Sequence, residues 1–145
     1  MGVMIQGLEA LRAKLKAMPE GIKQEVRTSL VQSANEIAST ARALAPVEDG
    51  DLRESIVVTE PGKLTPLHSS GGSHKVGDMA AAVTAGNAAV RYAAPVEFGH
   101  DGDGKPEGAA PRPFFWPAYR SKKKRVRSRT ARAINKAAKK IWSGK

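Results

Sequence analysis

Cysteine is absent from this chain, and aromatic side chains make up only 5% of its 145 residues. Without thiols the protein forms no disulfide framework and no thiolate zinc site. Its apolar runs are far shorter than the roughly 20 residues that a membrane-spanning helix needs, so we expect no membrane partner. The first residues also lack the charged and apolar regions of a secretory signal. The length suits a single domain, residues 1–145, with a hydrophobic core of its own.

Acidic residues are missing from residues 120–145, which hold twelve of the 24 lysines and arginines. The rest of the chain contains twelve basic and fourteen acidic residues, so a nearly neutral body carries a C-terminal segment of charge +12. Such an asymmetry indicates a polyanion or an acidic protein surface as a partner.

Apolar residues recur at helical intervals in three segments. The first predicted helix covers residues 7–17, and the second, a long one, covers about 19–44. The long helix should end before Pro46, because proline disfavours helical backbone in the residue that precedes it. Its apolar stripe consists of Ile22, Val26, Leu30, Ala34, Ile37, Ala41 and Leu44. A third helix is predicted over about 117–142, with a thin apolar stripe on an otherwise basic surface.

Short strands are predicted between the two long helices. β-branched and apolar residues favour strands at 56–59, 76–83 and 88–92, the last two joined by a turn at Gly86-Asn87. A short helical turn capped by Asp51 should precede the first of them. We expect these strands to form a small antiparallel sheet of about three to four strands.

Two segments, about 61–75 and 99–112, are rich in glycine and proline and show no apolar periodicity. Such composition is typical of flexible loops. The predicted fold class is therefore α+β: two N-terminal helices, one of them long, a small antiparallel sheet, and a long basic C-terminal helix.

Residues that could carry chemistry do not form a known pattern. His68, His74 and His100 all lie in predicted loops and are not spaced as metal ligands on one helix. The acidic segment 101–104 resembles the start of a calcium loop, but the later ligand positions are occupied by Lys105, Pro106 and Arg112. Nucleophile elbows and phosphate-binding glycine loops are also absent. We expect no metal, no cofactor and no enzymatic activity.

Three phrases contain most of the remaining information: LAPVEDGDLRESI (44–56), YAAPVEFGH (92–100) and PRPFFWPAY (111–119). Within these phrases the informative residues are Ala45-Pro46, Gly50-Asp51-Leu52-Arg53-Glu54-Ser55-Ile56, Tyr92-Ala93, Val96-Glu97-Phe98-Gly99 and Pro113-Phe114-Phe115-Trp116-Pro117-Ala118. In this order, between two long helices, they resemble the HK97 gp10-like family of small neck or tail-completion proteins of long-tailed phages. The resemblance extends over roughly residues 5–140, although His100 departs from the family pattern.

This resemblance implies a structural virion protein of the head–tail joint or tail end of a phage or a phage-like gene-transfer particle, assembled in the cytoplasm of the bacterial host. It also implies a ring of about six copies around the DNA channel, because a heterologous contact repeated by a closing rotation gives a cyclic assembly. Neighbouring connector, stopper or tail-tube proteins would be its partners.

A ring subunit needs two different contact patches. We expect them at the turn 97–99 and at the segment 113–119, with Arg53 as an ionic partner of Glu97. The residues expected at subunit contacts are Arg53, Glu97, Phe98, Gly99, Phe114, Phe115 and Trp116.

The basic C-terminal helix has two candidate partners. Its expected contact residues are Lys122, Lys123, Lys124, Arg125, Arg127 and Arg129. The favoured partner is an acidic surface of a neighbouring ring. The other is non-specific contact with DNA in the channel, which is less favoured because the segment lacks interleaved aromatic residues for base stacking. The alternative function is that of a small basic nucleic-acid-binding protein, which would bind DNA as a monomer with steep salt dependence.

Overall fold

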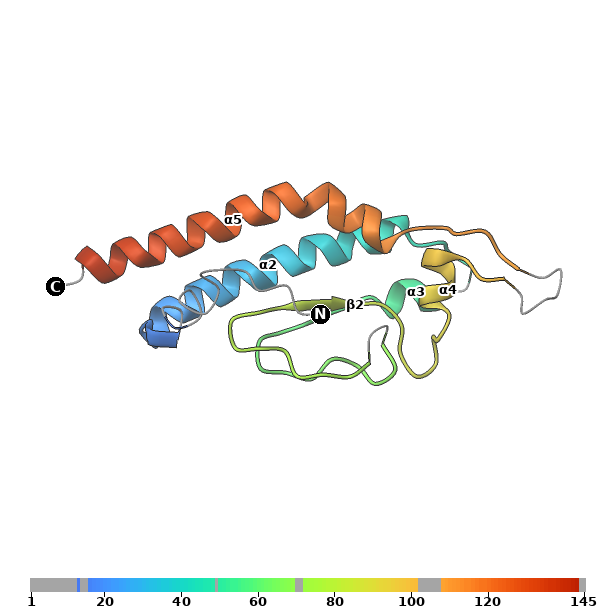
Figure 1. Ribbon diagram of the computed structural model, residues 1–145, viewed down its shortest axis with the longest axis horizontal. Helices are drawn as coiled ribbons and strands as arrows, with labels where there is room; N and C mark the ends of the chain where they lie inside the picture. Colours follow the sequence, from blue (N-terminus) through green and yellow to red (C-terminus); the bar gives the residue numbers. More distant parts are fainter. Residues whose placement is uncertain (1–12, 14–15, 49, 70–71, 102–107, 144–145) are drawn as a thin grey trace, which may run out of the picture.

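The computed structural model describes residues 13, 16–48, 50–69, 72–101 and 108–143, without the side chains of residues 141 and 142. Two long helices, α2 (Glu20–Leu44) and α5 (Phe115–Ser143), run antiparallel along the molecule (Figure 1). Helix α2 is the middle layer, because it contacts α5 and also both strands of a small sheet. The predicted α+β class and both long helices are thus confirmed. The helix predicted over 7–17 lies largely outside the described residues.

Helix α2 follows the predicted apolar stripe closely. It begins after Pro19, whose carbonyl accepts hydrogen bonds from the N–H groups of Ile22 and Lys23. It ends at Leu44 because Ala45 has an extended backbone, as expected for a residue before proline. Most of the stripe is buried or half-buried, but Leu44 itself is exposed.

Alanine supplies much of the core. Ala38, Ala41 and Ala118 have no exposed surface and share one cluster with Ile56 and Phe114, the largest fully buried side chains. Small residues allow two helix backbones to approach closely, and close-packed interiors leave little room for added volume. The contact between α2 and α5 therefore depends on small side chains as much as on apolar ones.

The sheet is smaller than predicted. Within the described residues it has two strands, β1 (Val57–Thr59) and β2 (Ala82–Thr84), paired antiparallel with Val58 opposite Val83. The strand predicted over 76–83 is reduced to its end, because Ala80 donates a backbone hydrogen bond to the Gly77 carbonyl in a turn.

The strand predicted over 88–92 is wrong. Gly86 has a φ of +89°, but the chain bends at residues 88–89 and not at the predicted Gly86-Asn87 turn, and it then leads into helix α4 (Ala93–Phe98). The Asn87 side-chain oxygen accepts hydrogen bonds from the N–H groups of Ala89 and Val90, both at 2.9 Å. These donors would be needed in a strand ladder, and the local side chain takes them first.

The predicted short helical turn is present as α3 (Asp51–Glu54), although Asp51 does not cap it. Gly50 occupies the cap position instead, with φ of +84°, and no side chain caps the helix. In each predicted loop the described residues on the two sides pair through an isolated antiparallel bridge, between Leu64 and Lys75 in the first and between His100 and Ala109 in the second. We call these two segments the first and the second arm.

We expect Ala118→Leu to lower the free energy of unfolding by about 1–3 kcal/mol, because the larger side chain must enter a closed core. Urea unfolding followed by far-ultraviolet circular dichroism measures the change. The matched control is Ala131→Leu, at an exposed position of the same helix, which should change stability by less than about 0.5 kcal/mol. Equal losses in the two variants would contradict the tight contact.

Candidate subunit-contact surface

The carboxylate of Glu97, on α4, lies at the N-terminus of α5. Its Oε2 accepts hydrogen bonds from the N–H groups of Phe114 (2.8 Å) and Phe115 (3.0 Å), and its Oε1 accepts one from Trp116 N–H (2.9 Å). The first N–H groups of a helix have no partner within it, and that end carries partial positive charge. Glu97, only 6% exposed, therefore satisfies three donors and connects two helices.

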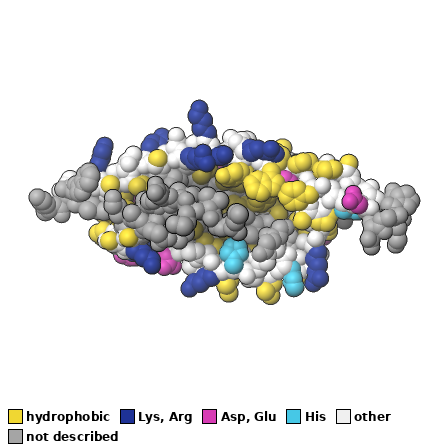
Figure 2. Space-filling view, viewed as in Figure 1, with side chains coloured by type: hydrophobic (Ala, Val, Ile, Leu, Met, Phe, Trp, Pro, Cys, Tyr) yellow, Lys and Arg dark blue, Asp and Glu magenta, His cyan; other side chains and the backbone are white. Residues whose placement is uncertain are grey.

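Exposed aromatic side chains lie beside this junction. Phe98 is 65% exposed and Trp116 is 46% exposed. The Trp116 ring packs edge-to-face against Phe115 and Tyr119, with ring centroids 6.3 and 5.8 Å apart. Figure 2 shows hydrophobic side chains gathered over the N-terminal end of α5, with Lys and Arg side chains along the rest of its edge. Rigid aromatic rings at the surface are typical of protein contacts.

A hollow of about 220 Å³ lies between β2, α4 and the first turn of α5. Its lining is mostly apolar and consists of Val83, Thr84, Ala85, Ala93, Ala94, Glu97, Phe98, Phe114, Phe115 and Trp116. The buried Thr84 hydroxyl has no hydrogen-bond partner among the described residues. The hollow and the exposed rings of Phe98 and Trp116 form one surface, which we call the aromatic patch.

Gly99 has a backbone role. Its φ is +75°, and a Cβ atom there would lie 2.8 Å from the Ala109 carbonyl oxygen and 2.9 Å from Pro111 Cδ. Only glycine allows this approach of the second arm. The residues expected at subunit contacts thus divide: Glu97, Gly99 and Phe114 act inside the monomer, Phe98 and Trp116 are exposed, and Phe115 is half-buried.

Arg53 does not contact Glu97 within the monomer. Its Nε donates to the Arg42 carbonyl at 3.1 Å, while Arg42 donates through Nε (3.0 Å) and Nη2 (2.6 Å) to the Ile56 carbonyl. The two arginines link the end of α2 to the segment of α3 and β1. The Arg53 side chain remains exposed.

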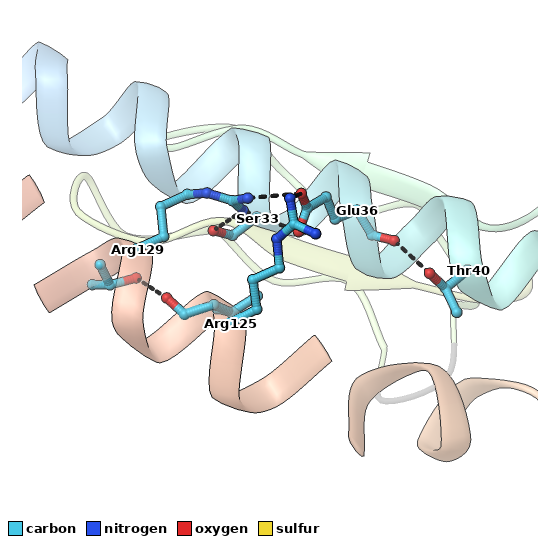
Figure 3. Close-up of polar contacts among 7 residues, drawn as sticks. Ser33, Glu36, Thr40, Arg125 and Arg129 are labelled. Carbon is cyan, nitrogen blue, oxygen red and sulfur yellow. Dashed lines mark hydrogen bonds and ion pairs between the residues drawn. The ribbon is translucent and has the colours of Figure 1, made fainter. Parts of the chain in front are cut away.

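Arginines of α5 converge on one carboxylate of α2 (Figure 3). Arg129 donates through Nη1 to Glu36 Oε2 (3.1 Å) and through Nη2 to Oε1 (2.7 Å). The same Nη1 donates to Ser33 Oγ at 3.1 Å, and Arg125 Nη2 lies 3.3 Å from Glu36 Oε1. Bidentate pairing of this kind is stronger and more directional than a single contact. Arg129, with a side chain only 14% exposed, is therefore a structural residue in the monomer.

A second ion pair, Lys140 with Glu25, repeats this contact further along. Glu25 and Glu36 are eleven residues apart on α2, and Arg129 and Lys140 are eleven apart on α5. Eleven residues make about three helical turns, so each pair lies on one face of its helix. Antiparallel helices then bring Glu36 to Arg129 and Glu25 to Lys140. This matched spacing is visible in the sequence and is the signal that indicates the pairing.

The ion pairs shift the protonation of α2. The hydrogen bond from Arg129 lowers the pKa of Glu36, and the charge of Arg125 adds to the effect. Likewise, the hydrogen bond from Lys140 lowers the pKa of Glu25.

The six basic residues expected at a partner contact do not share one face. Arg125 and Arg129 pair with α2, whereas Lys124 and Arg127 are exposed without a carboxylate partner among the described residues. Lys122 and Lys123 are half-buried. The sequence predicts a uniformly basic helix surface, whereas the structure divides these cations between contacts with α2 and exposure to solvent.

In the described part of the chain, no three histidine, aspartate or glutamate side chains gather in an arrangement that could hold a metal ion. None of the helices described is both long enough and apolar enough to cross a membrane.

Comparison with known proteins found one family. The model of the HK97-gp10-like family, described as "Bacteriophage HK97-gp10, putative tail-component", matches residues 9–99. The match includes the first sequence phrase and all but the last residue of the second, and it ends before the aromatic segment that opens α5. Searches of curated proteins and of solved structures gave no match.

We expect Glu97→Ala to lower the free energy of unfolding by about 2–3 kcal/mol, because it leaves buried N–H groups at the start of α5 unsatisfied. Urea unfolding measures the change. Glu54→Ala removes the same charge from the exposed surface of α3 and should cost less than about 0.5 kcal/mol. A loss in the Glu97 variant no larger than in this control would exclude the capping role.

The pair of Glu36 and Arg129 makes stability depend on pH. Because the folded protein lowers the pKa of Glu36, the stabilisation is present above the carboxyl's unfolded pKa and is lost as the pH falls through the lower folded pKa. Thermal unfolding should therefore show Glu36→Gln less stable than wild type at pH 7, with the difference shrinking on acidification below about pH 4. A difference independent of pH would rule out this ionic contribution.

Proposed function

The chain belongs to the HK97-gp10-like family of phage tail components, and from this premise we propose that it is a structural virion protein of the head–tail joint. There it would act as a neck, tail-completion or tail-terminator component of a phage or phage-like particle. Its partners would be neighbouring connector, stopper or tail-tube proteins, and it would assemble in the cytoplasm of the bacterial host. The role is one of assembly rather than catalysis.

The observation that carries the proposal is the aromatic patch. Phe98 and Trp116 expose large rings around an apolar hollow, although the chain has few aromatic residues to place there. The cap from Glu97 holds α4 against α5, so both rings sit on a rigid base. Contacts between proteins are strongest where such anchors are pre-organised.

We further propose that copies of the chain form a ring of about six, with the aromatic patch as one side of a heterologous contact. Arg53, exposed on α3, is a candidate for the other side. Glu97 is largely buried and occupied with three N–H groups. Its proposed role is to position Phe98 and Trp116, in place of the ionic contact with Arg53 expected from the sequence.

The second candidate function is that of a small basic nucleic-acid-binding protein. The concentration of charge in residues 120–145 supports it. This candidate requires that the chain take no part in joining heads to tails. The head–tail role requires instead that particles made without the chain have unjoined heads and tails.

Negative-stain electron microscopy of particles made with variant chains tests the proposal. We expect Phe98→Ala combined with Trp116→Ala to leave heads and tails unjoined, since each lost anchor costs about 2 kcal/mol or more of association free energy. The isolated variant should keep the circular dichroism spectrum of the wild type.

The matched control is Leu64→Ala combined with Leu67→Ala, because these leucines are at least as exposed and lie on the first arm. This control should give normally joined particles. Joined particles with the aromatic double variant would refute the proposed contact, and joined particles made without the chain would refute the head–tail role itself.

A further inference from the structure

The outward face of α5 carries a row of cations, which we call the basic ridge. Its residues are Arg120, Lys124, Arg127, Arg132 and Lys139, and all five are exposed. Their spacing places them on one broad side of the helix at 3.6 residues per turn. The nineteen steps from the first to the last extend over about 28 Å, or about eight base pairs of duplex DNA at 3.4 Å each.

The ridge remains open because other cations of α5 balance the acids of α2. Arg125 and Arg129 pair with Glu36, and Lys140 pairs with Glu25. By contrast, no described carboxylate forms an ion pair with a ridge residue. Two ridge arginines donate long hydrogen bonds to carbonyls of their own helix: Arg120 Nε to Trp116 and Arg132 Nε to Ser128, both at 3.4 Å.

An open hollow of about 530 Å³ lies along the ridge. The side chains that line it are either cationic or small: Arg120, Lys123, Lys124, Arg127, Ser128 and Ala131. Small side chains at Ser128 and Ala131 leave a shallow track between longer charged ones. An anionic chain lying in such a track would have cationic side chains on both sides of it.

We propose that the basic ridge binds the phosphate backbone of double-stranded DNA without reading its sequence. The proposal deepens the head–tail role and rests on it for the setting, because a joint between head and tail surrounds packaged DNA. A cationic row of this kind neutralises phosphates and releases their counterions, which drives binding independently of sequence.

The composition of the ridge favours duplex DNA over other anionic partners. Single strands are held largely by bases stacked on aromatic rings, and no aromatic residue occurs between Arg120 and Lys139. A stable protein contact needs a central apolar or aromatic anchor, whereas the centre of this face holds Ser128 and Ala131. This reverses the preference for an acidic protein surface that the sequence suggested.

The test measures binding of the full purified chain to a fluorescent 30-base-pair duplex, by anisotropy at several salt concentrations. The ridge variant carries Lys124→Gln, Arg127→Gln and Arg132→Gln. We expect at least about a tenfold loss of affinity, and a salt dependence shallower by about 1 for each phosphate-contacting cation removed. Several duplex sequences should bind the wild type equally well.

The matched control carries Lys63→Gln, Lys75→Gln and Arg91→Gln, which remove the same charge from exposed positions outside α5. It should keep wild-type affinity and slope. Equal losses in the two variants would overturn the proposal, because the effect would then come from net charge alone. So would unchanged DNA binding by the ridge variant together with failed head–tail joining, a result that would assign the ridge to an acidic protein. Because the binding assay uses no particles, a failure there leaves the head–tail role standing.

Discussion

The hydrogen bonds between the Glu97 carboxylate and the start of α5 are the constraint on which this structure depends. They attach the short helix α4 to the long helix α5, at a helix N-terminus where three consecutive N–H groups need partners. The same contact closes the core over Phe114 and presents Phe98 and Trp116 outward. One buried side chain thus determines both the interior of the domain and the proposed assembly surface.

Charge on α5 is divided in a comparable way. Glu25 and Glu36 bind cations on the inner face of the helix, so the docking of α5 onto α2 is electrostatic as well as apolar. On the outer face, the described cations form no ion pair with a described carboxylate. A helix that looks uniformly basic in sequence therefore has one side that binds α2 and one side that faces solvent. The proposed subunit contact lies at the N-terminal turn of this helix, and the proposed DNA contact lies along its outer face.

Much of the fold could be predicted because the apolar residues of a long amphipathic helix recur at a helical period that is visible in the sequence. The bounds of α2 and α5 lie within a few residues of those predicted. The number of strands in the sheet was overestimated. A segment such as 88–92 suits a strand unless a neighbouring side chain accepts the backbone N–H hydrogen bonds that the strand would need. Asn87 does so here. Of the residues expected at subunit contacts, Phe98 and Trp116 are exposed, and their contact with a neighbour stays a prediction. Glu97 and Gly99 have structural roles within the monomer that the sequence did not predict.

The sequence by itself determined the two long helices, the absence of a thiol site, the excess of positive charge near the C-terminus and, through its short phrases in order, the family. These depend on local spacing and composition, which a linear chain displays in full. Only the tertiary structure decided which of these side chains form contacts within the monomer and which remain exposed. Whether Glu97 caps a helix or meets a neighbour, and whether Arg129 or Arg127 is free, depends on what lies opposite each of them. That is a property of packing between segments far apart in the chain.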